Sequence, residues 1–307
     1  MGCVMTRKVG FIGLGAMGKP MAVNLLKKGF SLTVYDLRQE PAEELVRHGA
    51  ASAGSPGKIA EVSDVVISML PSSPDVEEVF LGKGGVIEGI REGAIAIDMS
   101  TIAPSTTRKV GKALSGKGAR MIDAPVARTV KAAVEGKLAI FVGGEKAVFE
   151  ECRPILEAMG TDIYHAGDLG SGEVVKIVNN FILATFVCAI SEGLVLGVRA
   201  GVEPGVLFEA LSKSSANSFA LQNHFKNFAM KGDFREGLFS VEYMLKDLGL
   251  ALGMGKEFQV PLLLGSLSNQ LYESARAAGK GKNYYPVIIT LLEDLTGVKV
   301  RSEVSDT

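Results

Sequence analysis

A glycine-rich segment near the N-terminus places the strongest constraint on the fold. It follows a short apolar run at residues 8–12 and precedes an amphipathic stretch at residues 20–28, which Gly29 ends. A second strand-like run, residues 31–36, closes on Asp36. Strand, glycine turn, helix and strand, with a carboxylate about 20 residues on, form the context of the dinucleotide-binding fingerprint. The turn consists of Gly13, Leu14, Gly15, Ala16, Met17 and Gly18.

Each part of this fingerprint has a physical task. Gly13 permits the tight turn, Gly15 lets the backbone approach a pyrophosphate, and Gly18 lets helix and strand pack closely. The helix that follows offers unpaired N–H groups and a positive dipole end to the phosphates. We expect the cofactor to meet Asp36, Leu37 and Arg38 at the end of the second strand. The Asp36 carboxylate would repel a 2′-phosphate and favours NAD, while Arg38 keeps NADP possible.

Strand and helix patterns continue to alternate as far as residue 168. Apolar strand-like runs lie at residues 64–70, 94–98, 119–122, 138–142 and 162–164, with helical patterns such as residues 146–159 between them. Repeated βα units predict an α/β fold whose N-terminal domain, residues 1–168, is a Rossmann-type, doubly wound and mostly parallel sheet.

Ligands in such folds bind beyond the carboxyl ends of the strands. Candidate cofactor and substrate contacts therefore follow three of the predicted strands. An arginine at such a place could hold a small anion, although a solvated surface arginine is an equally good interpretation. The candidates are Leu70, Pro71, Ser100, Thr101, Arg128 and Thr129.

A long apolar run at about residues 174–200 predicts a helix that joins two domains. Because it is apolar on every side, we expect it to be buried. It carries too many polar residues for a membrane span, among them Glu192. Only helical patterns follow, so the second domain, residues 169–307, is predicted to be all-helical.

Three polar residues interrupt this helix on one face. Lys176, Asn179 and Asn180 are spaced i, i+3 and i+4. A buried lysine is costly unless its charge has a use or a partner, so the three are candidates for a catalytic site. The structural alternative is that Lys176 extends to solvent from the first turn while the amides bond neighbouring backbone.

Composition excludes several partners. The formal net charge is −1, from 33 Lys+Arg and 34 Asp+Glu, without a long basic run, so neither nucleic acid nor a membrane surface is an expected partner. Three scattered cysteines and three scattered histidines predict no metal site and a reduced, cytoplasmic setting. Residues 1–6 match a loose myristoylation pattern, but the first strand follows too closely for us to expect lipidation. The tail, residues 300–307, is expected to fray.

The motifs together resemble those of the β-hydroxyacid dehydrogenases, the family of 3-hydroxyisobutyrate dehydrogenases and tartronate semialdehyde reductases. The resemblance covers nearly the whole chain. It rests on the fingerprint with the preceding Phe11 and Ile12, on Asp98-Met99-Ser100-Thr101, on the stretch from Gly170 to Asn180, and on Lys246-Asp247-Leu248. It implies that Lys176 is the catalytic acid/base, that Asn179 and Asn180 hold the substrate, and that Lys246 reaches the cofactor.

One loop departs from the family pattern. A Ser-Gly-Gly sequence is usual after Asp-Ala-Pro-Val, whereas this chain has Ala127-Arg128-Thr129. That loop is similar to the Gly-Arg-Thr loop of sulfolactaldehyde reductases, although those enzymes carry serine at the position of Leu183. The arginine implies a strongly anionic substrate, such as a succinic or methylmalonic semialdehyde or sulfolactaldehyde.

The function expected from these features is NAD(H)-dependent interconversion of a small anionic 3-hydroxy acid and its semialdehyde. Family members commonly assemble through the helical domain, so a homodimer or homotetramer is expected. The alternative from another class is a catalytically silent cofactor-binding and oligomerisation module of the same fold. Retention of Lys176 counts against that alternative.

Overall fold

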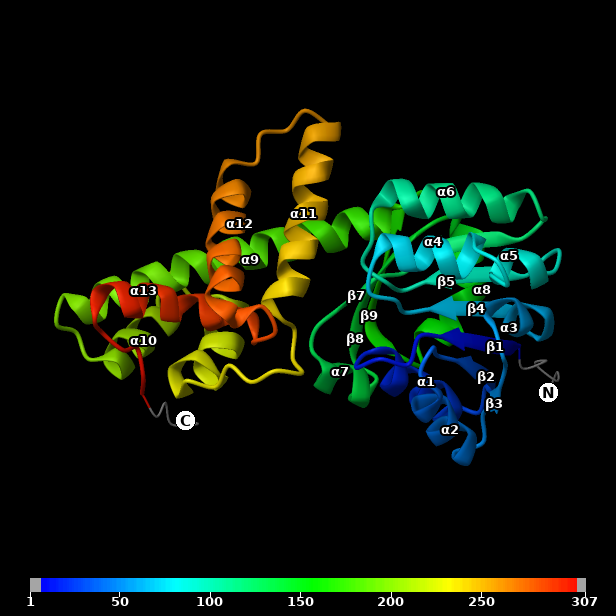
Figure 1. Cartoon of the computed structure of the whole chain (residues 1–307), viewed down its shortest axis with the longest axis horizontal. Helices are drawn as coiled ribbons and strands as arrows, with labels where there is room; N and C mark the ends of the chain where they lie inside the picture. Colours follow the sequence, from blue (N-terminus) through cyan, green and yellow to red (C-terminus); the bar gives the residue numbers. More distant parts are fainter. Residues whose placement is uncertain (1–6, 303–307) are drawn as a thin grey trace. The chain divides into compact units, whose positions relative to one another are not determined.

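The computed structural model describes residues 7–302, and the chain divides into two compact units, Met1–Lys176 (unit 1) and Ile177–Thr307 (unit 2). The myristoylation pattern of residues 1–6 lies outside the described residues. Figure 1 shows the elements of both units.

Unit 1 contains a nine-stranded sheet. Its first six strands are mutually parallel in the order β3-β2-β1-β4-β5-β6, and β8 then pairs antiparallel with β6 and β7 and parallel with β9. The prediction of a Rossmann-type, mostly parallel sheet is confirmed. The strands are β1 (Lys8–Ile12), β2 (Ser31–Tyr35), β3 (Ala51–Ser52), β4 (Val65–Ser68), β5 (Ile95–Asp98), β6 (Arg120–Asp123), β7 (Val126–Ala127), β8 (Leu138–Gly143) and β9 (Gly160–Gly167).

Helices cover both faces of this sheet because successive strand residues point to opposite sides. On one face Phe11 and Ile67 join side chains of α1, α2 and α8; on the other, Ile12 and Val66 join those of α3, α4 and α6. The helices of unit 1 are α1 (Gly18–Lys27), α2 (Gln39–Arg47), α3 (Pro56–Val62), α4 (Ser73–Leu81), α5 (Val86–Gly89), α6 (Pro104–Ser115), α7 (Val130–Glu135) and α8 (Lys146–Leu156).

Strand β7 was not predicted from the sequence, which indicated only a loop at residues 124–129. Two residues, directly after Pro125, are too short a run to show an alternating pattern. In the structure Val126 pairs with Ile140 and Ala127 with Ala139. The backbone that leads from the end of β6 to Arg128 is therefore held in register against β8.

Unit 2 is built from helices, as predicted, and the one isolated β-bridge among its residues up to 302 joins Ser240 and Tyr284. In Figure 1, α11 and α12 lie side by side and cross α9. The elements are the long helix α9 (Ser171–Arg199), inside which the division between the units falls, α10 (Pro204–Ser212), η1 (Ala220–Phe225), η2 (Ala229–Lys231), α11 (Val241–Glu257), α12 (Leu263–Ala275), η3 (Arg276–Lys280), η4 (Tyr285–Ile288) and α13 (Ile289–Thr296).

The expectation that α9 is buried on every side is wrong. Only 33% of the 18-residue stretch of α9 with high hydropathy is buried. By length and composition alone, the helix would be long and apolar enough to cross a membrane. Ala184, Val187 and Leu194 lie in the core of unit 2, whereas Ile182 and Phe186 remain 42% and 48% exposed. The helix thus has one apolar face inside the unit and a second apolar face at the surface.

The core of unit 2 encloses a histidine among aromatic rings. His224 is buried, its Nδ1 lies 2.5 Å from the Tyr284 hydroxyl, and its ring meets Tyr284 and Tyr285 edge to face. Burial lowers the pKa of His224 to about 4. The imidazole is therefore neutral in the folded chain at neutral pH.

This burial predicts acid lability of unit 2. The unfolded chain takes up a proton at His224 near pH 6.5, and the folded chain takes it up only near pH 4, so the free energy of unfolding falls as the pH drops between these values, by about 3 kcal/mol at pH 4. Urea unfolding, followed by near-ultraviolet tyrosine circular dichroism, should show a flatter pH dependence for His224→Gln. The same change at the exposed His48 should leave the wild-type slope, and an unchanged slope in His224→Gln would contradict the assignment.

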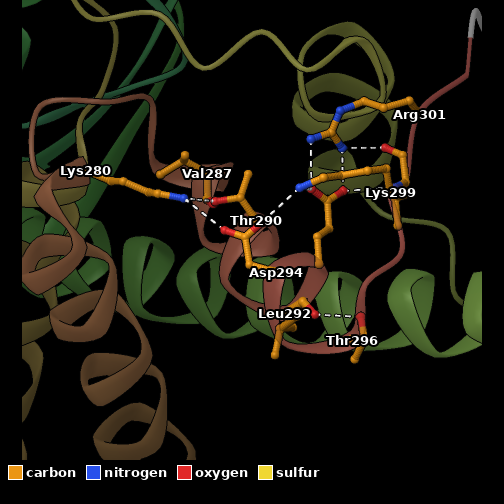
Figure 2. Close-up of polar contacts among 10 residues, drawn as sticks. Lys280, Val287, Thr290, Leu292, Asp294, Thr296, Lys299 and Arg301 are labelled. Atoms are coloured by element: carbon orange, nitrogen blue, oxygen red, sulfur yellow. Dashed lines mark hydrogen bonds and ion pairs between the residues drawn. The ribbon is translucent and has the colours of Figure 1, made fainter.

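The C-terminal segment is held in place as far as residue 302, so the expectation of a frayed tail is wrong for residues 300–302. The fully buried Glu293 accepts hydrogen bonds from the Val300 N–H at 2.8 Å and from both terminal nitrogens of Arg301. Figure 2 shows Arg301 and Lys299 at this position, with Lys299 also paired to Asp294 at 2.9 Å. A buried carboxylate needs such partners, and they fix the chain end.

Candidate active site

The glycine-rich turn leads from β1 to α1 and is hydrogen-bonded to the end of β2. Gly13 has a φ of +93°, and its N–H donates to the Tyr35 carbonyl at 2.9 Å. The next N–H, that of Leu14, donates to Asp36 Oδ2 at 2.7 Å. A side chain at Gly13 would meet the Met69 carbonyl at 2.3 Å, so only glycine fits this turn.

The other two glycines differ in the space around them. A Cβ at Gly15 would meet nothing within 4 Å, whereas a Cβ at Gly18 would lie 1.9 Å from the Gly13 carbonyl oxygen. The backbone is thus open at Gly15 and closely packed at Gly18, where α1 begins. An open turn at a helix N-terminus fits the pyrophosphate of a dinucleotide.

The acidic residue of the fingerprint is paired with the arginine that follows it. Asp36 Oδ1 accepts from the Arg38 backbone N–H at 2.9 Å and from Arg38 Nε at 3.3 Å. The Arg38 side chain remains 67% exposed, and Leu37 is 90% exposed. A carboxylate and a largely exposed guanidinium therefore lie together where the ribose of a dinucleotide is expected.

Ser100 joins the loops after β4 and β5. Its hydroxyl donates to Asp98 Oδ1 at 2.6 Å and accepts from the Leu70 N–H at 2.8 Å, and Ser68 donates to the same carboxylate oxygen at 2.7 Å. Ser100 is fully buried, while Pro71 is exposed and Thr101 is half-buried. This network fixes the loop backbones on which Leu70, Pro71 and Thr101 are carried.

Asp98 was not among the predicted site residues. Burial raises its pKa to about 6, against the opposing hydrogen bonds from Ser100 and Ser68. An acidic residue that ends an apolar strand run was the available signal for it. Its partners come from two different strand ends, and the sequence alone does not show that pairing.

Asp123, at the end of β6, caps the first turn of α9. Its two oxygens accept from the Gly170 N–H at 2.6 Å and the Glu173 N–H at 2.8 Å, and burial raises its pKa despite these bonds. Glu173 in turn accepts from the Ile102 N–H at 3.1 Å. The start of the helix is therefore tied to the strand ends of unit 1.

Lys176 follows Glu173 by one turn and is 8% exposed. The alternative in which its side chain extends to solvent therefore does not hold. Its position on the helix is set from the first turn onward by the Asp123 cap, because the backbone between them is regular helix.

A hydrogen-bonded chain in unit 2 links the amides of α9 to α11. Asn179 Nδ2 donates to Asn180 Oδ1 at 2.9 Å, Asn180 Nδ2 donates to Asp247 Oδ2, and Lys246 Nζ lies 3.0 Å from Asp247 Oδ1. Asp247 is 1% exposed and Asn180 4%, whereas Asn179 is exposed. The structure thus brings three predicted residues together through Asp247, which the sequence analysis named only as part of a motif and not as a site residue.

The remaining two predicted residues lie after β7. Arg128 pairs with Asp162 on β9, its Nη2 lying 2.7 Å from Asp162 Oδ2, and Thr129 is the exposed N-cap residue of α7. Asp162 is a further residue that the sequence analysis did not identify.

These features define a class of protein. A Rossmann unit with an open glycine turn, followed by a helix that carries a buried lysine, is the arrangement of an NAD(P)-dependent oxidoreductase. Residues 8–167 match the model for the NAD binding domain of 6-phosphogluconate dehydrogenase, and residues 170–292 match that for the NAD-binding domain of NADP-dependent 3-hydroxyisobutyrate dehydrogenase.

Relatives that the chain matches over nearly their whole length are dehydrogenases and reductases of the same class. The chain is 43% identical over 293 residues to 2-(hydroxymethyl)glutarate dehydrogenase of Eubacterium barkeri, covering 95% of this chain and 97% of that protein. It is 36% identical to 3-sulfolactaldehyde reductase of Escherichia coli, covering 95% and 98%. The structure of Mycobacterium tuberculosis 3-hydroxyisobutyrate dehydrogenase with L-serine superposes with a TM-score of 0.86 at 32% identity, covering 94% and 99%.

The chain belongs to the 3-hydroxyisobutyrate dehydrogenase family, and the predicted family and activity class are confirmed. It is an NAD(P)-dependent hydroxyacid dehydrogenase acting on a CH–OH group.

Proposed function

We propose that Lys176 is the general acid/base of this enzyme and that its substrate is a small 3-hydroxy acid with its semialdehyde. The observation that supports this role is a buried lysine on a helix whose first turn is fixed by Asp123. Burial makes an ammonium costly unless it has a partner or serves a function, and proton transfer to a carbonyl oxygen is such a function.

The residues of the chain then have separate tasks. A bound nicotinamide supplies or accepts the hydride. In the direction of reduction, the Lys176 ammonium stabilises the charge that grows on the substrate oxygen and donates the proton to it. Asn179 and Asn180 orient the substrate, and Asp247 holds the Asn180 amide so that its carbonyl end stays toward Asn179. Ser100, which holds the loops after β4 and β5, and Thr129, next to Arg128, are further proposed substrate contacts.

The proposed cofactor contacts lie on several parts of the chain. The open turn would hold the pyrophosphate, with Leu14, Ala16 and Met17 around Gly15, and the loops after β4 and β5 would line the nicotinamide side. Lys246 is a further proposed cofactor contact. Asp36 at the end of β2 favours the free ribose hydroxyls of NAD. The exposed Arg38 leaves binding of NADP as the weaker alternative.

The proposed substrate carries a second anionic group, which Arg128 receives. A guanidinium matches carboxylate and sulfonate oxygens with two parallel hydrogen bonds. Two relatives are named for acidic substrates, 2-(hydroxymethyl)glutarate and 3-sulfolactaldehyde. Carboxylate semialdehydes and sulfolactaldehyde are therefore the substrate classes to compare.

The test is nicotinamide turnover with a panel of short aldehydes. The panel contains succinic and methylmalonic semialdehydes, sulfolactaldehyde and a neutral aldehyde of similar size, each with NADH and NADPH. We expect the highest kcat/KM with NADH and an anionic aldehyde. Cofactor binding without turnover of any member would instead support the silent-module alternative.

We also propose that the protein is a cytoplasmic homo-oligomer in which the exposed face of α9 packs against a second copy. Val178, Ile182 and Phe186 lie at helical spacing on that face and are 42–48% exposed. Val178 also lines an apolar cavity of about 210 Å³ formed by α9, α11 and the loop at residues 258–262. Large apolar side chains exposed at successive turns of one helix are a feature of protein–protein contact surfaces.

Phe186→Asp should convert the oligomer to a monomer, because a carboxylate would be buried without a partner at the interface. Size-exclusion chromatography with light scattering measures the mass directly. Leu295→Asp is the matched control, since Leu295 is 83% exposed on α13 and lies outside this face. A wild-type chain that is already monomeric would contradict the proposal.

A further inference from the structure

Arg128 has an unusual backbone conformation. Its φ is +84°, and within residues 7–302 the only other residue besides glycine with a positive φ is Gln259. The left-handed region is sterically unfavourable for an arginine, so the surrounding structure must hold it there. The preceding residue, Ala127, is fixed by its pairing with Ala139, and α7 begins two residues later.

The side chain of Arg128 is bound to the protein itself. Its Nη1 donates to the Lys137 carbonyl at 2.7 Å and to Thr161 Oγ1 at 3.3 Å, and its Nη2 pairs with Asp162 Oδ2 at 2.7 Å. Both terminal nitrogens are thus engaged. A substrate anion that used the same two nitrogens would have to displace Asp162.

The sheet explains why Asp162 is the partner. Strand β8 lies between β7 and β9, with Ala139 paired to Ala127 on one side and to Asp162 on the other. The register shifts between Leu138 and Ala139, so Thr161 is an extra residue in β9. The bulge places Thr161 and Asp162 together at the end of β8 that the Arg128 side chain crosses.

The surroundings of Asp162 favour its charged, carboxylate form. Its pKa is lowered first by the hydrogen bond from the Thr161 hydroxyl, at 2.8 Å, and then by Arg128. The pair is also accessible, since the two side chains are 40% and 39% exposed. Exposed ion pairs shift an equilibrium by about fivefold at most, so a substrate anion can displace this one.

We propose that Asp162 is a specificity-determining residue that competes with the anionic group of the substrate for the guanidinium of Arg128. This inference rests on the proposed function of Arg128. Without substrate, the Arg128 guanidinium is paired with Asp162. It exchanges this partner for the distal group of a substrate when that group carries a charge and two or more oxygens. Neutral aldehydes leave the internal pair intact, so Asp162 weakens the binding of anionic substrates alone and sets how strongly the enzyme prefers them over neutral ones.

The test is Asp162→Asn, which removes the charge and keeps the size and the hydrogen-bonding capacity. We expect KM for the preferred anionic semialdehyde to fall about three- to fivefold, with kcat unchanged and no change in KM for the neutral aldehyde. In an Arg128→Ala background the same change should have no effect on KM, which is the double-mutant test of coupling.

The matched control is Glu150→Gln. Glu150 pairs with Arg153 in unit 1, and their side chains are 47% and 38% exposed, so the variant makes the same change in net charge at a similar ion pair. Equal KM values for wild type, Glu150→Gln and Asp162→Asn would overturn the inference, as would equal changes for anionic and neutral aldehydes. Failure of the proposed function would be seen separately, as an absence of turnover in the wild-type protein.

Discussion

Lys176→Ala is expected to lower kcat by about 10²- to 10⁴-fold, the usual contribution of a positioned general acid. The loss should fall on kcat because the lysine acts on charge that develops during hydride transfer. Lys176→Arg should not restore the rate, since a guanidinium keeps the charge but does not release its proton near neutral pH. Stopped-flow and steady-state measurement of nicotinamide absorbance gives both constants.

Two controls separate chemistry from folding in this experiment. Lys112→Ala removes an exposed lysine from α6 and should leave kcat unchanged. Titration of cofactor fluorescence with Lys176→Ala should give an unchanged Kd, which shows that unit 1 is intact. A Lys176→Ala variant with wild-type kcat would remove Lys176 from the mechanism.

The second large effect is expected at the glycine turn. In Gly18→Ala the new Cβ would lie 1.9 Å from a backbone oxygen of Gly13, so the turn or α1 must move. Strain of this kind costs about 1–3 kcal/mol of stability, and we expect cofactor affinity to fall at least tenfold as well. Gly15→Ala should weaken cofactor binding without loss of stability, because its Cβ meets nothing within 4 Å until a pyrophosphate approaches.

Gly54→Ala is the matched control for both variants. Gly54 is exposed, and a Cβ there also meets nothing within 4 Å. Thermal unfolding and cofactor titration of the three variants should give three patterns: both properties lost, binding alone lost, and neither lost. If Gly15→Ala binds cofactor as tightly as wild type, the pyrophosphate does not lie against this turn.

The sequence was sufficient to predict the elements that depend on local pattern. The fingerprint, the alternation of strands and helices up to residue 168 and the helices beyond it follow from periodicity and from glycine and proline positions. The polar face of α9 was found in the same way. These features need only residues that are near neighbours in the chain.

The contacts that position the site could not be predicted in this way. Asp98, Asp123, Asp162 and Asp247 each bind a partner from another element, and the sequence separations run from 30 residues, for Ser68 and Asp98, to 67, for Asn180 and Asp247. Their partners are decided by strand order and register, which pattern alone does not give. The exposed face of α9 was mispredicted for a related reason, because an apolar face does not show whether it is covered within the chain or by a second copy.

At Arg128, backbone stability and the proposed role in substrate binding favour different residues. Glycine would adopt a φ of +84° without strain, and replacing arginine there would relieve about 1–2 kcal/mol. The same replacement would remove the guanidinium. Random mutation under selection for thermal tolerance alone should therefore recover glycine at residue 128, and selection for growth on an anionic substrate should retain the arginine.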